Sequence, residues 1–191
     1  MVDTETVVRA KTDRAAFGSL YDRYQPLVTR YCMRRLFDRT VAEDVVSEIF
    51  LTVASNLRTI PGRTETDFRC WLFRIATNAV NAYLRQTKRR RELLEAAARS
   101  RQLGRTENAA TAPGEWETLD WPAVYEAIMA LDERDQTILM LRFFAGSSYE
   151  EIAEVVNSTA GAVRTALSRT LAGLREEFNP RQPSPQRGRG E

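Results

Sequence analysis

The spacing of apolar residues along the chain predicts α-helices almost throughout. Between residues 14 and 36, apolar side chains recur every three or four positions, which gives a helix one buried face; they are Phe17, Leu20, Tyr21, Tyr24, Leu27, Val28, Tyr31 and Cys32. A second stripe predicts a helix over residues 40–57, with Thr40 as its N-cap, and comprises Val41, Val45, Ile49, Val53 and Leu57. A third helix is expected to begin at Asp67, a favoured N-cap type, and its apolar positions keep the helical period as far as Leu84. No alternating pattern of strand length appears.

Breaks between these periodic segments divide the chain into two domains. The Ile60-Pro61-Gly62 sequence is a strong turn signal, and the polar segment around Pro113-Gly114 is too long for an ordinary connection inside one compact domain. A second cluster of helices is predicted over residues 121–131, 133–144, 148–156 and 159–178. We therefore expect an all-α fold of two small helical domains joined by a flexible linker, with the divisions 1–95, 96–120 (linker), 121–178 and 179–191 (disordered tail).

Residues 148–175 have the pattern of a helix-turn-helix. The first helix is expected to bury Ile152, Ala153, Val155 and Val156, and the second Val163, Leu167, Leu171, Leu174 and Phe178. Asn157 tolerates the left-handed conformation that such a turn often needs, and Thr159 is a suitable cap for the second helix. The front of that helix carries groups suited to phosphates and base edges in a major groove, namely Arg164, Thr165, Ser168 and Arg169. A plain helical hairpin with a solvated outer face would show the same pattern.

The small net charge of +2 hides a strong segregation of charge along the chain. The 28 basic and 26 acidic residues nearly cancel overall. Residues 85–105, however, hold eight basic and two acidic side chains, whereas residues 106–160 hold two basic and eleven acidic ones. Such a partition is expected when one surface binds a polyanion and another must avoid or oppose it.

The composition excludes several kinds of chemistry. With no histidine, the chain has no histidine zinc site, no Ser-His or Cys-His nucleophile pair and no imidazole proton shuttle. Cys32 and Cys70 lie in apolar stretches and form no CxxC pair, which favours two buried thiols in a reducing compartment. We therefore expect no metal, no cofactor and no catalytic site.

The sequence also predicts a soluble, cytoplasmic protein without membrane insertion. The longest run without a charged residue is the ten residues from Ile75 to Leu84, against the roughly 20 that span a bilayer. The acidic N-terminus lacks the apolar core of a signal peptide.

Motifs in both halves carry a resemblance to a known family. They are AEDVVSEIFL at 42–51, FRCWLFRIATN at 68–78 followed by Tyr83-Leu84-Arg85, LDERD at 131–135, LRFFAG at 141–146 and SYEEIA at 148–153. In this order, with a linker between the halves, the chain resembles the extracytoplasmic-function sigma factors, the two-domain promoter-specificity subunits of bacterial RNA polymerase. The resemblance covers about residues 14–95 and 121–178. It implies two domains like sigma regions 2 and 4, which recognise and melt the minus-ten element and read the minus-thirty-five element.

The resemblance implies that the 40–57 helix docks on core RNA polymerase. Asp44, Ser47 and Glu48 share a face away from the apolar stripe and can offer carboxylates to a basic clamp helix. Without the family, a solvated charged face would be the better interpretation of the same residues.

The third helix is similar to the one that reads the minus-ten element. Side chains off its apolar stripe can track phosphates and meet the edges of unstacked bases; they are Arg74, Asn78, Asn81, Arg85, Lys88 and Arg89. The family implies that the loop of residues 58–67, with Arg58 and Arg63, forms a pocket for a base taken out of the stack. Trp71 offers a stacking platform, but its place on the apolar stripe favours core packing.

The helix of residues 159–175 is expected in the minus-thirty-five major groove, with Thr159, Arg164, Thr165, Ser168 and Arg169 as contacts. Here and on the third helix the chain departs from the family at four positions: Thr77 and Asn81 stand where the family often has Arg and Asp, and Ala162 and Ala166 where it commonly has Thr and Arg. With two polar groups fewer on the recognition helix, Arg164, Thr165, Ser168 and Arg169 are expected to make more of the base contacts.

Other functions are open to the same sequence. Family membership implies an anti-sigma factor that clamps the two domains. A ligand-responsive helix-turn-helix regulator would instead bind duplex DNA alone, without polymerase. An enzymatic reading is weak, because adjacent acidic residues such as Glu43-Asp44 and Glu150-Glu151 diverge by about 100° on a helix and cannot share a site.

Overall fold

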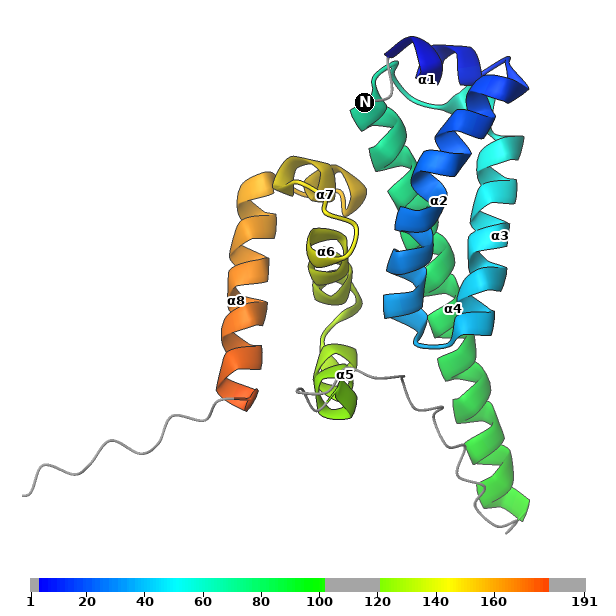
Figure 1. The fold of residues 1–191 in the computed structure, drawn as a ribbon. Helices are drawn as coiled ribbons and strands as arrows, with labels where there is room; N and C mark the ends of the chain where they lie inside the picture. The colour runs from blue at the N-terminus through cyan, green and yellow to red at the C-terminus, as the bar shows by residue number, and fades with distance from the viewer. Residues whose placement is uncertain (1–3, 102–120, 179–191) are drawn as a thin grey trace, which may run out of the picture.

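The computed structural model describes residues 4–101 and 121–178 (Figure 1). These residues form eight α-helices and one 3₁₀ turn, with no strand among them. The predicted all-α class is therefore confirmed for the described part of the chain. Most of the predicted linker and the whole predicted tail lie outside the described residues.

The first domain is a bundle of three long helices with a short helix across one end (Figure 1). Its elements are α1 (Thr4–Ala10), α2 (Arg14–Leu36), α3 (Arg39–Ser55), the 3₁₀ turn η1 (Leu57–Thr59) and α4 (Glu65–Arg101). The fourth helix extends to Arg101, so it includes the first six residues of the segment assigned to the linker. The short helix α1 was not predicted.

Aromatic side chains fill the space between α2 and α4. Tyr24 packs edge to face on Phe68 at 5.2 Å, and Tyr31 does the same on Phe73 at 5.8 Å. All four are almost fully buried. Each such pair adds about 0.5–1.5 kcal/mol beyond the burial of its area, so these contacts hold α4 at a fixed rotation against α2.

Two helix starts in the first domain differ from their predicted positions. The cap of α3 is Asp38 rather than Thr40, because the Asp38 side chain accepts a hydrogen bond from the Val41 amide at 3.0 Å. Helix α4 begins at Glu65, two residues before the predicted start. Its reciprocal cap joins the Thr64 hydroxyl to the Asp67 amide and the Asp67 carboxylate to the Thr64 amide.

The second domain contains four helices, as predicted. They are α5 (Trp121–Ala130), α6 (Glu133–Phe143), α7 (Tyr149–Val155) and α8 (Ala160–Phe178). Asn157 adopts the predicted left-handed conformation between α7 and α8, with φ 51°. The Thr159 hydroxyl accepts from the Ala162 amide at 3.2 Å and caps α8. Asn157 and Thr159, which predicted the helix-turn-helix from the sequence, thus form its turn and its cap in the structure.

The seam between α7 and α8 is apolar, but several residues predicted to be buried are not fully so, Leu171 and Leu174 among them. Ile152 and Val163 are fully buried across the hairpin, and Leu167 is 4% exposed. Phe178, by contrast, is 43% exposed at the end of α8. Val155 and Val156 are only half-buried, where α7 ends and the turn begins.

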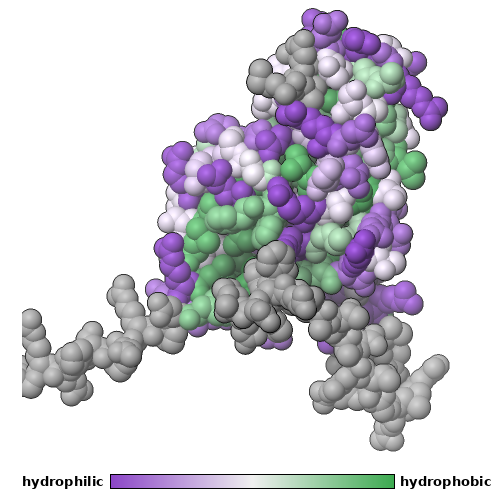
Figure 2. Space-filling view, in the orientation of Figure 1, coloured by the Kyte–Doolittle hydropathy of each residue, from purple (hydrophilic) through white to green (hydrophobic). Residues whose placement is uncertain are grey.

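The two domains pack against each other. Helix α7 contacts α4, and α6 contacts α2, so one apolar cluster runs through both domains. In Figure 1, α6 and α7 lie beside the α2 and α4 side of the first domain, while α4 extends beyond them. Figure 2 shows hydrophobic side chains gathered on the face over α5, α6 and α8. No helix in the described ranges is both long and apolar enough to cross a bilayer.

Candidate nucleic-acid interface

A row of polar residues on α4 forms the first part of the candidate site. Arg74, Asn78, Asn81 and Arg85 follow one another at intervals of four, three and four residues, so at about 100° per residue they share one face of the helix. We call these four residues the α4 ridge. It rises about 16 Å along the helix axis. Three of its four members contact the second domain, directly or through Arg35.

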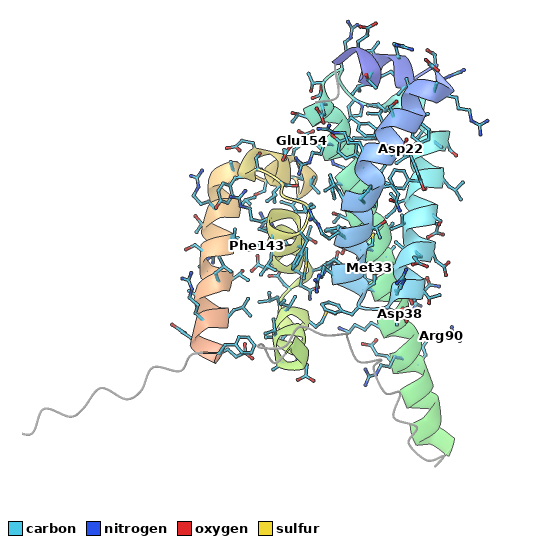
Figure 3. All side chains as sticks on the ribbon, viewed as in Figure 1. Asp22, Met33, Asp38, Arg90, Phe143 and Glu154 are labelled. Carbon is cyan, nitrogen blue, oxygen red and sulfur yellow. The ribbon has the colours of Figure 1, made fainter. Side chains whose placement is uncertain are left out.

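Both arginines of the α4 ridge bind groups of the second domain. The Arg74 guanidinium donates to the backbone oxygen of Glu154 at 2.7 Å and lies 3.9 Å from its carboxylate. Figure 3 shows Glu154 on α7, toward the first domain. The Arg85 guanidinium lies 2.8 and 3.1 Å from the two carboxylate oxygens of Glu133. All four side chains remain about half exposed, so these are surface ion pairs.

Asn81 is not placed as predicted. The sequence predicts an exposed side chain, but Asn81 is only 7% exposed. Its side-chain oxygen accepts a hydrogen bond from Arg35 at 2.5 Å. Arg35 lies on α2, is 1% exposed, and also donates to the side-chain oxygen of Gln136 on α6. The reason is a long-range contact: Arg35 on α2 binds both the Asn81 side chain on α4 and the Gln136 side chain on α6, which keeps Asn81 facing inward. Asn81 as a DNA contact stays a prediction that requires its release from Arg35.

Thr77, the other family departure on α4, also faces inward. Its hydroxyl oxygen lies 3.1 Å from that of Tyr31, and its side chain is 7% exposed. A threonine at this position therefore contributes a buried hydrogen bond between α2 and α4. Trp71 is half-buried and packs on Phe68 at 6.1 Å, in agreement with the predicted core packing.

The remaining predicted minus-ten residues are exposed. Lys88 and Arg89 lie on α4. Arg90, the next residue, is labelled in Figure 3 on the stretch of α4 that passes beyond the second domain. Arg58 and Arg63 lie in the loop before α4 and are also exposed. These basic residues are available to a nucleic-acid backbone in the described arrangement.

The loop before α4 is held in shape by its own hydrogen bonds. The Asp67 carboxylate accepts from the amides of Arg63 and Thr64, both at 2.9 Å, and these bonds hold the pKa of Asp67 below its ordinary value. The Lys11 ammonium donates to the backbone oxygens of Ile60 and Gly62 at 3.0 and 3.1 Å. These hydrogen bonds define the conformation of the loop.

Gly62 allows the Asp67 cap to form. Its φ of +70° is a conformation that side chains disfavour, and a Cβ atom there would lie 2.0 Å from an oxygen of Asp67. Only glycine brings the loop backbone this close to the cap of α4.

The second part of the candidate site is the outer face of α8. All five predicted contacts are exposed: Thr159, Arg164, Thr165, Ser168 and Arg169. The guanidinium of Arg164 lies over the Tyr149 ring at 5.0 Å, which orients it near the start of α8. Ala162 is exposed on the same helix, whereas Ala166 is 7% exposed. Because position 166 is buried, having alanine there in place of the family's arginine changes the outer face less than the sequence predicts.

The predicted polymerase-docking residues form an open acidic face on α3. Asp44, Ser47 and Glu48 are all exposed. Leu51 lies one turn further along and is 68% exposed, the largest value among the exposed large hydrophobic residues described. Leu51 therefore adds an exposed apolar side chain to this acidic face. Sequence reasoning missed Leu51, although its position three residues after Glu48 places it on that face.

Arg69 is a second residue that the sequence did not single out. Its guanidinium lies 3.3 Å from the Glu151 carboxylate and donates to the backbone oxygen of Ala145 at 2.6 Å. Together with Arg35, it ties the first domain to the second. Neither arginine could be found from periodicity alone, because their partners lie 76 to 101 positions away.

Both cysteines are buried, as predicted. Burial raises the pKa of Cys32 to about 12, and burial together with the nearby Glu154 and Glu151 carboxylates raises that of Cys70 to about 12. Each thiol is therefore protonated and unreactive near neutral pH.

Comparison with protein families matches both halves of the chain. Residues 20–90 match Sigma-70 region 2, and residues 122–174 match Sigma-70, region 4. The chain is 31% identical over 172 residues to the ECF RNA polymerase sigma factor BldN of Streptomyces coelicolor, covering 89% of this chain and 63% of that protein. It is also 31% identical to the ECF RNA polymerase sigma-E factor of Haemophilus influenzae, covering 88% of this chain and 90% of that protein.

Solved structures share the fold. CnrH, in complex with the cytosolic domain of CnrY, superposes with a TM-score of 0.67 at 22% identity, over 95% of this chain and 100% of that one. The sigma factor RpoE of Bartonella quintana, in complex with the anti-sigma factor NepR, gives 0.64 at 20% identity, over 87% and 98%. With both sigma regions in order and a relative matched over nine-tenths of its length, the chain belongs to the ECF RNA polymerase sigma factors.

Proposed function

We propose that this protein directs promoter-specific initiation by docking on core RNA polymerase and by contacting both promoter elements, one with each domain. The observation that carries the proposal is the presence of two separate polar faces, the α4 ridge with its loop and the outer face of α8, on domains that match sigma regions 2 and 4.

The first domain would hold the melted minus-ten strand. Arg58, Arg63, Lys88 and Arg89 are exposed cations on either side of the α4 ridge and can bind phosphates. The loop, held in shape by the Asp67 cap, would receive an unstacked base. A preformed loop loses little conformational entropy when it binds the base, so more of the binding free energy would be available for promoter opening.

The second domain would read the minus-thirty-five duplex. Arg164, Thr165, Ser168 and Arg169 present donors and hydroxyls from one exposed face of α8. An arginine or lysine can bind guanine in the major groove with two hydrogen bonds, worth about 1–3 kcal/mol of discrimination.

The two contacts require the domains to separate. The promoter elements lie about 25 base pairs apart by their names, which is about 85 Å at 3.4 Å per pair. In the described arrangement α8 packs on α7, which packs on α4, so the two faces lie within about two helix diameters, or roughly 20 Å. A chain of 19 residues between 102 and 120 can extend about 65 Å, which with the width of the domains spans the elements.

Docking would use the acidic face of α3. Asp44 and Glu48 can pair with a basic helix of the polymerase clamp, and the exposed Leu51 can bury its side chain at the same contact. We expect the chain to act in the cytoplasm, where bacterial polymerase transcribes, and to contribute binding rather than catalysis.

An anti-sigma factor is the further partner that we infer. The two structural neighbours were solved with the cytosolic domain of CnrY and with the anti-sigma factor NepR, respectively. A protein of this kind would hold the two domains in a form that cannot span the promoter. Co-purification from the native host would identify it together with polymerase.

Gel-mobility measurements with and without core polymerase test the proposal. A sigma factor should form a stable complex with duplex promoter DNA only when core enzyme is present. The alternative, a helix-turn-helix regulator, should bind its duplex site equally well without core enzyme. The matches to sigma regions 2 and 4 favour the sigma factor.

A further inference from the structure

A lysine from outside the loop of residues 58–67 holds two of the loop's backbone oxygens. The Lys11 ammonium donates to the oxygens of Ile60 and Gly62 at 3.0 and 3.1 Å, across 49 and 51 positions of the chain. An ammonium group has three N–H donors, and hydrogen bonds from a charged donor are roughly twice as strong as neutral ones. Two such bonds, to oxygens two residues apart, fix the path of the backbone between them.

The junction between α1 and α2, which carries Lys11, is itself firmly held. Val7 and Ala10 on α1 are almost fully buried, and α1 packs on both α2 and α4 at the end of the bundle where α4 begins (Figure 1). Two residues after Lys11, the Asp13 carboxylate accepts from the Ala15 amide at 2.8 Å and caps α2. With a packed helix on each side, the bundle determines the position from which Lys11 reaches the loop.

Lys11 and Asp67 bind opposite kinds of backbone groups in the same turn. Lys11 holds two oxygens, the second of them that of Gly62, and the Asp67 carboxylate holds the next two amides along the chain, both at 2.9 Å. The Ile60 side chain is 3% exposed and anchors the loop in the core, whereas residues 61–64 are exposed. The turn is thus held through its backbone while it remains open to a ligand.

We propose that Lys11 is a positioning residue for minus-ten recognition: by holding the loop of residues 58–67 in one shape, it narrows the choice of base that the loop accepts. The inference rests on the proposed role of this loop in receiving an unstacked base. A binding site discriminates strongly between ligands when its polar groups cannot shift to suit a different one, because the wrong ligand then leaves buried groups unpaired. Without the Lys11 contacts, the loop would be able to rearrange around several bases. Lys11 therefore acts on base preference through the loop.

The test uses the full chain in complex with core polymerase, as the wild type and as three variants. Lys11→Met removes both hydrogen bonds to the loop and keeps an unbranched apolar side chain. Lys11→Arg keeps a cation whose N–H groups can bind the same two oxygens. Arg14→Met is the matched control, because it removes the same charge from an exposed position three residues away that takes part in none of the loop contacts described.

Base preference is measured by binding each holoenzyme to a promoter from the native host whose minus-ten positions are randomised, and by sequencing the bound DNA. At one minus-ten position, Lys11→Met should reduce the ratio between the best and the second-best base about fivefold, while the other positions keep their ratios. Lys11→Arg should keep all wild-type ratios because it restores the donors. Arg14→Met should also keep them, because a charge that attracts phosphates carries no sequence information. Unchanged ratios in Lys11→Met, or an equal loss at every position, would overturn the proposal.

Hydrogen exchange of the free chain, followed by mass spectrometry, tests the same contact without DNA. Amides of residues 58–67 should exchange severalfold faster in Lys11→Met than in Arg14→Met, and equal exchange would also overturn the inference. The wild type separates this inference from the proposed function. If its holoenzyme selects no sequence near minus ten, both fail; if it selects one and Lys11→Met selects the same one, only the role of Lys11 is wrong. Thermal melting by circular dichroism verifies that each variant folds.

Discussion

The cap of α4 offers a sharp test of how the loop before it works. Asp67→Ala removes an oxygen that accepts from the Arg63 and Thr64 amides, both at 2.9 Å. Loss of a helix cap costs about 0.5–2 kcal/mol, and the loss of two hydrogen bonds at once places this substitution in the upper half of that range, about 1–2 kcal/mol. At about 2–4 °C per kcal/mol for a chain of this size, the melting temperature should fall by roughly 2–8 °C.

The substitution should also impair promoter melting more than DNA binding. Without the cap, the loop of residues 58–67 must become ordered when it receives a base. The entropy lost in that ordering makes formation of the open complex less favourable. We expect transcription from a duplex promoter to fall several-fold, whereas a template already mismatched across the minus-ten element should be transcribed almost as well as by the wild type. Run-off transcription on both templates measures the difference.

Asp38→Ala is the matched control. It removes the side-chain cap of α3, which accepts from the Val41 amide at 3.0 Å, but leaves the loop before α4 intact. It should destabilise the fold while lowering transcription equally from both templates. The same loss on duplex and pre-melted templates with Asp67→Ala would show that the loop has no special part in melting.

The cap also gives a pH dependence. The pKa of Asp67 is held below its usual 3.8 by hydrogen bonds from the Thr64 and Arg63 amides. Its contribution to stability is therefore complete above the unfolded pKa and is lost as the pH falls through the lower folded pKa. The difference in stability between wild type and Asp67→Ala should be constant near neutrality and should shrink below about pH 4. A difference that stayed unchanged in acid would mean that the carboxylate does not act as described.

Other predictions concern the remaining faces of the molecule. Arg169→Ala should weaken binding of the holoenzyme to the minus-thirty-five duplex by about 1–3 kcal/mol and relax base preference there; unchanged preference in a binding-site selection would remove Arg169 from the readout. Ile152→Ala empties a fully buried position between α7 and the core and should cost about 2–5 kcal/mol in chemical denaturation; a cost below about 1 kcal/mol would contradict the packing. Glu48→Gln should raise the dissociation constant for core polymerase about tenfold, or about 1.4 kcal/mol. Glu43→Gln, whose carboxylate already pairs with Arg39, should not.

Much of the fold follows from local patterns. The bounds of α2 match the predicted residues 14–36, and each helix of the second domain begins and ends within one residue of its predicted position. These segments are predictable because their apolar period and their turn residues agree, as with Asn157 at φ 51° before the Thr159 cap.

Helix starts were less predictable, because several residues near each start can cap it. Asp38 and Thr40 are both favoured cap types, and the structure uses Asp38. Asp67 does cap α4, but from inside the helix, in partnership with Thr64. The choice depends on which side chain reaches the free amides, and a sequence pattern does not record that.

Contacts between the domains were outside the reach of sequence patterns. Arg85 and Glu133 lie 48 positions apart, and Arg35 and Gln136 lie 101 apart. The sign of the charged segments did indicate that a basic region and an acidic region have opposite preferences. Nothing in the periodicity showed that they would meet each other, or that Asn81 would turn inward to Arg35.

Promoter-specific initiation is the most direct test of the central claim. Purified protein and core polymerase are incubated with a library of genomic fragments from the native host, and the 5′ ends of the transcripts are sequenced. We predict discrete start sites that depend on this protein and share one sequence near minus ten and another near minus thirty-five. Transcripts that start at the same positions and in the same amounts without the protein would contradict the assignment.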